Sequence, residues 1–156
     1  MAAADFWSET TSALFRSASY HEPTDPVERL LAYVDLRKAL LKGKLPEFTC
    51  LAGTMTQEVY LTHPEIRDAA GRSITEHAMT LVPDIQAAMR ERGTAGDWTA
   101  RSLALYMQST IQEAFILAKA GGGLQVAADC IDHLRRYLEL LFTPSPQPTN
   151  LSQEVV

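Results

Sequence analysis

Histidine residues close to acidic residues are the first candidates for chemistry in this chain. His77 follows Glu76, but a zinc-binding helix of the His-Glu-x-x-His type needs a further histidine, and the chain has Thr80 and Leu81 at the later positions. His133 is adjacent to one aspartate and four residues after another, a spacing that could pair an imidazole with a carboxylate. We interpret this pattern as the solvated outer face of a helix, because that is what such charge patterns usually are.

Other patterns of enzyme active sites are also missing from the sequence. It contains no Ser-His-Asp set, no glycine-rich phosphate loop and no dense cluster of carboxylates. The chain is therefore predicted not to be an enzyme and to have no catalytic residues, no metal site and no cofactor. Cys50 and Cys130 lie within helical apolar patterns, so we expect buried free thiols rather than a disulfide.

Residue types suited to binding a small molecule are more prominent. Aromatic rings, thioethers and small hydrogen-bonding groups recur on segments whose helical spacing turns them inward, and a small-molecule site needs an apolar cavity with a few polar groups. The predicted ligand-binding residues are Tyr33, Phe48, Cys50, Thr54, Met55, Gln57, Met79, Tyr106, Met107, Thr110 and Phe115. Any one of them could simply fill a core, so the prediction depends on the group.

Length, composition and charge narrow the class of protein. A chain of 156 residues with 46% hydrophobic and 21% charged residues fits a single globular domain. No apolar run approaches the ~18 residues of a membrane span, and the first residues lack the basic region of a secretory signal, so we expect a cytoplasmic protein without a membrane role. The formal net charge of −5 argues against direct binding of DNA, which requires clustered lysine and arginine.

The spacing of apolar residues predicts an all-α helical bundle of about six helices. We expect them at residues 3–19, 26–41, 47–61 and 63–92, followed by a hairpin of two helices within residues 97–142. Asp25, a capping box at Thr62 and Asp97 are the expected helix starts, and Pro83 is expected to kink or divide the fourth helix. Residues 1–142 would form one ligand-binding and dimerisation domain, and the proline-rich residues 143–156 an extended or disordered tail.

The hairpin carries more apolar surface than one subunit can cover. On its second arm, one apolar stripe consists of Ala127, Ile131, Leu134, Leu138 and Leu141, and a second stripe beside it consists of Val126, Cys130, Tyr137 and Leu140. One stripe is enough to dock a helix on its own core, so the second needs another surface. The simplest is the hairpin of a second copy, giving a four-helix bundle. The predicted interface residues are Leu105, Ile116, Val126, Cys130, His133, Tyr137 and Leu140.

The segments Cys50-Leu51-Ala52-Gly53-Thr54, Gln57-Glu58 and His63-Pro64-Glu65-Ile66-Arg67 precede a long helix and an Ala/Leu-rich hairpin. This order resembles the C-terminal ligand-binding and dimerisation domain of TetR-type transcriptional regulators, over about residues 5–142. The resemblance implies a homodimer that senses a small-molecule effector and thereby changes the spacing of two DNA-binding heads, as in a repressor. The residue types suggest a mostly apolar effector with a carbonyl or hydroxyl group. No helix-turn-helix is recognisable ahead of residue 5, so DNA binding is expected only through a head domain absent from this chain.

A second function fits the same pattern. A stand-alone helical carrier or adaptor would also dimerise and bind a hydrophobic ligand or a protein helix, without any role at DNA. A helix-turn-helix encoded immediately upstream of residue 1 in the native gene would favour the regulator.

Overall fold

The computed structural model describes residues 2–94 and 96–143, with side chains described from residue 9 onward. Every regular element in these ranges is helical, which confirms the all-α prediction. The elements are α1 (Ala2–Arg16), η1 (Ser19–His21), α2 (Pro26–Ala39), α3 (Leu45–Phe48), α4 (Leu51–Val59), α5 (Pro64–Met79), α6 (Val82–Arg92), α7 (Ala100–Leu117), η2 (Ala118–Gly122) and α8 (Gly123–Phe142). The predicted tail lies outside the described residues except for its first position.

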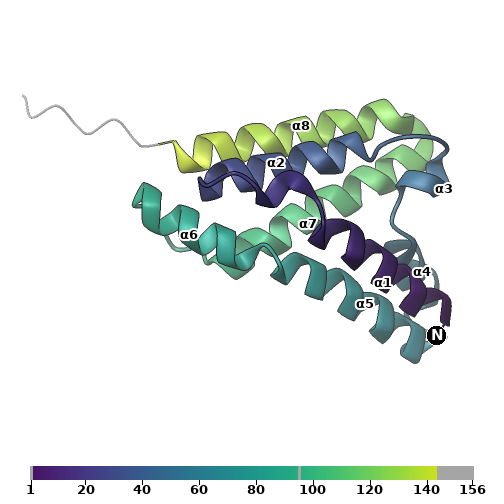
Figure 1. Cartoon of the computed structure of the whole chain (residues 1–156). Helices are drawn as coiled ribbons and strands as arrows, with labels where there is room; N and C mark the ends of the chain where they lie inside the picture. Colours follow the sequence, from purple (N-terminus) through teal and green to yellow (C-terminus); the bar gives the residue numbers. More distant parts are fainter. Residues whose placement is uncertain (1, 95, 144–156) are drawn as a thin grey trace, which may run out of the picture.

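Helix α7 is the centre of the bundle. It packs on α5, α6 and α8, while α2 packs on both α6 and α8, and α1 and α4 cover α5 (Figure 1). The first apolar stripe predicted for the second hairpin arm forms part of the core, because all its members except Leu141 are almost fully buried. The largest fully buried side chains include Leu30, Tyr33, Ile85, Met107, Ile111, Ile131, Leu134 and Leu138.

A predicted helix start is confirmed where the side chain of the predicted N-cap residue accepts a hydrogen bond from the first turn of the helix. Asp25 caps α2 as predicted, since its carboxylate accepts from the backbone N–H two residues later at 2.8 Å. Thr99, and not Asp97, caps α7, with its hydroxyl accepting from the N–H three residues later at 3.0 Å. The capping box expected at Thr62 is wrong, because His63 occupies the N-cap of α5 without a side-chain hydrogen bond.

Two of the six predicted helices are divided in the structure. The segment predicted as one helix over residues 47–61 is interrupted at Thr49 and Cys50, whose ψ angles of 159° and 116° are extended. The chain then restarts as α4, with the Cys50 sulfur accepting from the N–H of Gly53 at 3.3 Å. The break expected near Pro83 is present, since α5 and α6 are separate helices. Cys50 and Cys130 are free, as predicted, but half-buried rather than buried.

A turn that contains Gly121 and Gly123 joins α7 to α8 and completes the predicted hairpin. Gly121 and Gly123 have φ angles of +115° and +63°, a region that favours glycine. The segment Ala100–Phe142 is long and apolar enough to cross a membrane by length and composition alone, with a mean hydropathy of 1.3 in its 18-residue window, of which 33% is buried. One such segment is weak evidence of a span, and the turn folds this one into two helices packed on each other.

Candidate ligand-binding site

A cavity of about 170 Å³ lies between α1, α2, α5 and α7, next to the α3–α4 connection. Its apolar wall consists of Leu14, Phe15, Leu40, Phe48, Ala52, Ile74 and Phe115, and its polar wall of Thr11, Arg37, Glu47, Thr49, Cys50, Ser73, His77 and Gln108. Leu14 and Glu47 are exposed, so the mouth lies beside them. Since a cavity of about 150 Å³ can hold benzene, this one suits a molecule of roughly one ring.

Arg37 is a buried cation in the wall of this cavity, only 9% exposed. Its Nη1 donates to the Tyr33 hydroxyl and to His77 Nε2, each at 3.3 Å. Its guanidinium carbon lies 5.3 to 5.9 Å from the ring centroids of Phe15, Phe115 and Tyr33, within reach of a cation–π attraction. In residues 9–94 and 96–143, no carboxylate lies within ion-pair distance of this guanidinium.

His77 lies beside Arg37 as a neutral imidazole. Burial, and secondarily the charge of Arg37, lowers the pKa of His77 to about 4. Arg37 Nη1 can only donate, so His77 Nε2 is an acceptor, and the Tyr33 hydroxyl 2.9 Å away donates to it as well. Burial raises the pKa of Tyr33 and keeps this hydroxyl protonated. Because Nε2 accepts these bonds, we assign the ring proton to Nδ1. The ring also packs on Phe15, with 4.4 Å between centroids.

Gln108 contributes a buried amide from α7. Its side chain is 5% exposed, and its Oε1 has no hydrogen-bond partner among the described residues. The amide nitrogen of Gln112, one turn later, is also buried without a hydrogen-bond partner among the described residues. Buried polar atoms are nearly always paired, so an unpaired amide on a cavity wall indicates a position for a ligand group or a water molecule.

The structure places the predicted ligand-binding residues in several environments. Phe48, Cys50 and Phe115 line the cavity, and Tyr33 lies directly behind its wall through its bonds to two lining residues. The others lie outside it. Met107 is fully buried in the core, and the half-buried residues are Thr54, Met55, Met79 and Thr110.

Gln57 and Tyr106 are exposed, so the expectation that they face inward is wrong. Gln57 lies on α4, which covers α5 from outside and leaves much of its own surface to solvent. Tyr106 lies away from the buried face of α7, and its ring contacts that of Tyr137 on α8 at 5.2 Å. It therefore belongs to the same outer face as the predicted interface residues.

Sequence reasoning missed three polar groups of the cavity, of which Arg37 and Gln108 are buried and His77 is half-buried. Arg37 stands four residues after Tyr33 on the buried face of α2, so a charged residue on an apolar stripe was the available signal. His77 was considered only as a zinc ligand and was rejected as one. Gln108 lies on α7 between buried residues, and no pattern distinguishes it from a core-edge amide.

The predicted interface residues of the hairpin, which include the second stripe of α8, are only partly covered by their own subunit. Leu105, Tyr137 and Leu140 are 40%, 42% and 76% exposed, His133 is also exposed, and the half-buried members are Ile116, Val126 and Cys130. The first stripe, by contrast, is buried as predicted, except that Leu141 is half-buried. The hairpin thus has one apolar face for the core and a second that the subunit does not use.

Comparison with known families identifies the fold. The family model described as tetracyclin repressor-like, C-terminal domain matches residues 26–134. The chain belongs to this family. The matched range of this TetR-type domain contains Arg37, His77 and Gln108 and most of the hairpin. No curated protein and no solved structure matched the chain.

TetR-type C-terminal domains are regulatory, and they generally dimerise and bind small-molecule effectors. TetR-type regulators are in general soluble cytoplasmic proteins.

Proposed function

We propose that this TetR-type domain senses a small-molecule effector and dimerises within a transcriptional regulator, without catalysing a reaction. The observation that supports the proposal is the cavity, where aromatic walls surround polar groups from three helices: buried Arg37 on α2, half-buried His77 on α5 and buried Gln108 on α7. A mostly apolar pocket with a few convergent polar groups is the usual form of a small-molecule site. The effector is a small, mostly apolar molecule, and the chain acts as its receptor.

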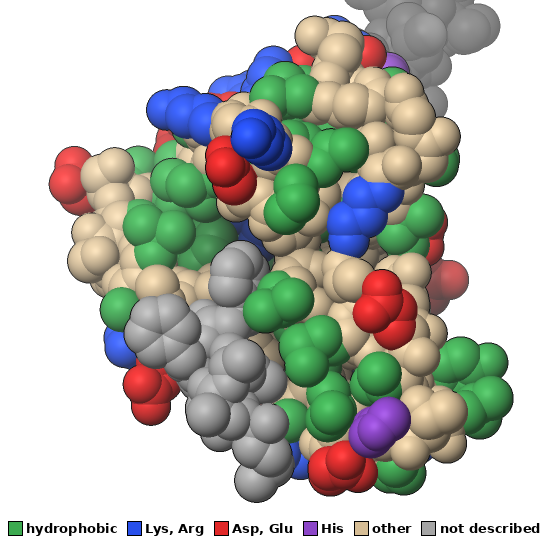
Figure 2. All heavy atoms as spheres, turned by 90° about the vertical axis from the view of Figure 1, so that its right-hand side faces the viewer, with side chains coloured by type: hydrophobic (Ala, Val, Ile, Leu, Met, Phe, Trp, Pro, Cys, Tyr) green, Lys and Arg blue, Asp and Glu red, His purple; other side chains and the backbone are tan. Residues whose placement is uncertain are grey.

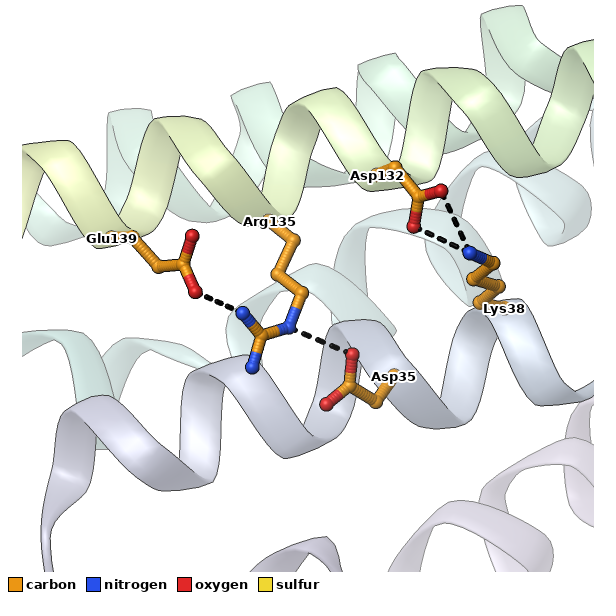
Figure 3. A network of polar contacts seen from close by, with 5 residues as sticks. All are labelled: Asp35, Lys38, Asp132, Arg135 and Glu139. Atoms are coloured by element: carbon orange, nitrogen blue, oxygen red, sulfur yellow. Dashed lines mark hydrogen bonds and ion pairs between the residues drawn. The ribbon is translucent and has the colours of Figure 1, made fainter.

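Helix α2 connects the cavity to the hairpin. Arg37 faces the cavity, while the neighbouring Lys38 contacts Asp132 of α8 at 2.7 Å and Asp35 accepts from Arg135 of α8 at 2.9 Å (Figure 3). Exposed pairs contribute little stability one by one, but together with the packing they set how α2 lies on α8. An effector that binds one position of α2 better than another would therefore shift the arrangement of the interface helix.

The second stripe of α8 provides the contact with a second copy. Val126, Cys130, His133, Tyr137 and Leu140 are separated by four, three, four and three residues, the spacing of a coiled-coil seam. A two-fold axis would bring this stripe against its own copy and bury both. DNA binding would belong to a head domain, not to this acidic domain.

Two measurements test the proposal together. Sedimentation equilibrium is expected to show a dimer at micromolar concentration, and a thermal-shift screen of small aromatic and aliphatic probes is expected to raise the melting temperature, because a ligand of the native state stabilises it. Leu14→Trp and Ala52→Phe, which place bulk at the mouth and in the wall of the cavity, should abolish the shift. A monomer whose melting temperature no probe raises would overturn the proposal.

Coupling between ligand binding and the distance between the two subunits distinguishes a regulator from a carrier. A spin label at Glu9, exposed on α1, would report the distance between the two copies, with Cys50 and Cys130 replaced by serine. A bound probe should change this distance in a regulator. An unchanged distance in a probe-saturated dimer would favour the carrier and count against the regulator.

A further inference from the structure

We propose that the effector is an organic anion, a carboxylate on an apolar body of about one ring, whose charged group pairs with Arg37. This inference rests on the proposed function, which makes the cavity a ligand site. It changes the chemistry predicted from the sequence, where the residue types suggested a neutral carbonyl or hydroxyl compound.

The first argument is the unbalanced charge of Arg37. A guanidinium cannot be deprotonated in a protein, so its positive charge remains although the side chain is only 9% exposed. Nη1 donates to Tyr33 and His77, and both of these partners are neutral. The N–H groups on Nε and Nη2 have no acceptor in the part of the chain that the structure describes. A carboxylate would accept from this planar fork through two parallel hydrogen bonds and neutralise the charge.

The one acidic side chain on the described wall does not supply that neutralisation. Glu47 is exposed at the mouth, and its carboxylate accepts from the backbone N–H of Lys44 at 2.9 Å at the start of α3. This carboxylate is solvated, so its effect on a buried guanidinium is screened. The imidazole of His77 holds Arg37 through a lone pair and adds no charge of its own.

One helix end at the wall of the cavity adds a partial positive charge. The first turn of α4 contributes Cys50 and Ala52 to the wall, and a helix N-terminus carries a partial positive charge. Lys42 and Lys44 lie in the connection to α3, and Lys119 donates to Thr54 of α4. Figure 2 shows this end of the molecule, with lysine and arginine side chains in its upper part and acidic side chains among them.

The cavity limits the size of the anion. Its volume of about 170 Å³ is close to the ~150 Å³ that holds a single benzene ring. The rings of Phe15, Phe48 and Phe115 form much of the wall, and those of Phe48 and Phe115 meet edge to face at 6.5 Å. An aromatic ring fits such a wall through the same contacts. Benzoate and phenylacetate are the simplest anions with this shape.

Calorimetric titration with matched acids and amides tests the inference. Benzoate and phenylacetate are expected to bind the dimer about 10- to 100-fold more tightly than benzamide and phenylacetamide, the range given by a hydrogen bond to a charged group. Arg37→Met should remove the preference, and Arg37→Lys should keep part of it, because an ammonium retains the charge without the planar fork. Arg90→Met, which changes an exposed arginine on α6 away from the cavity, should bind like the unaltered protein.

The outcomes separate the two proposals. Amides that bind as tightly as the acids would overturn the anion inference and leave the proposed function standing, because the cavity would still bind a ligand. Binding of neutral toluene or indole with no binding of any acid would do the same. If Arg37→Met does not fold by circular dichroism, the Nε–H resonance of Arg37 in the unaltered protein decides: it should move with benzoate and not with benzamide, and an unmoved resonance would refute the inference.

Discussion

Leu140→Ala is predicted to weaken the dimer without changing the fold of the subunit. Leu140 lies at the end of the second stripe of α8 and is 76% exposed, so its side chain contributes little to its own core. The unfolding free energy of the subunit should therefore stay within about 0.5 kcal/mol of its original value.

The effect on the dimer follows from the area that the side chain would bury there. Complete burial of a leucine stabilises by about 1.5 to 3 kcal/mol, and alanine retains part of that. The loss is then about 1 to 2 kcal/mol per subunit. A two-fold interface contains the residue twice, so the dimer loses about 2 to 4 kcal/mol, which raises its dissociation constant about 30- to 1,000-fold.

Leu61→Ala is the matched control. Leu61 is 77% exposed, almost the same as Leu140, but it follows α4 and lies outside the hairpin. Sedimentation equilibrium over a range of concentrations should show a weakened dimer for Leu140→Ala and an unaltered one for Leu61→Ala. Equal dissociation constants for the two variants would refute the assignment of the second stripe to the interface.

Three further predictions concern stability and can be checked by urea denaturation. The pKa of His77 is about 4 in the folded chain and about 6.5 in the unfolded one, so between these values the unfolded state binds a proton that the folded state does not. The free energy of unfolding therefore decreases as the pH is lowered through this range. We expect about 2 kcal/mol of the loss between pH 7 and pH 4.5 to disappear in His77→Gln but not in His63→Gln, at an exposed position. Gly71→Ala should stabilise by about 0.5 to 1 kcal/mol, because the position is helical and a Cβ there meets nothing within 4 Å. Asp25→Ala should destabilise by about 1 kcal/mol through loss of the α2 cap, whereas Asp97→Ala, at the cap position that the structure does not use, should change stability by less than about 0.5 kcal/mol.

Local patterns predicted much of the architecture. Asp25 marked the start of α2, since its carboxylate acts on the backbone of its own neighbours. The helical period separated the two stripes of α8, so Ile131 was assigned to the core and Leu140 to a free face, as the structure has them. These features depend on contacts within one helix or turn.

Predictions failed where the outcome depends on a second element. The sequence around Cys50 is compatible with one continuous helix, but the backbone is extended at Thr49 and Cys50, and α4 starts anew and packs on α5. Tyr106 has the residue type of a pocket wall, but the face of α7 on which it stands is turned away from the core. Residue type and period alone did not distinguish a cavity wall from an outer face.

The sequence by itself determined that this protein is a helical bundle with a doubly apolar hairpin, because period and helix-stop residues are local properties. The tertiary structure alone decided where a ligand would bind. Arg37, His77 and Gln108 come from three helices far apart along the chain, and nothing in the spacing of any one helix says that their polar groups meet at one cavity. Periodicity defines which side of a helix faces inward, and the packing of α1, α2, α5 and α7 defines what that side faces.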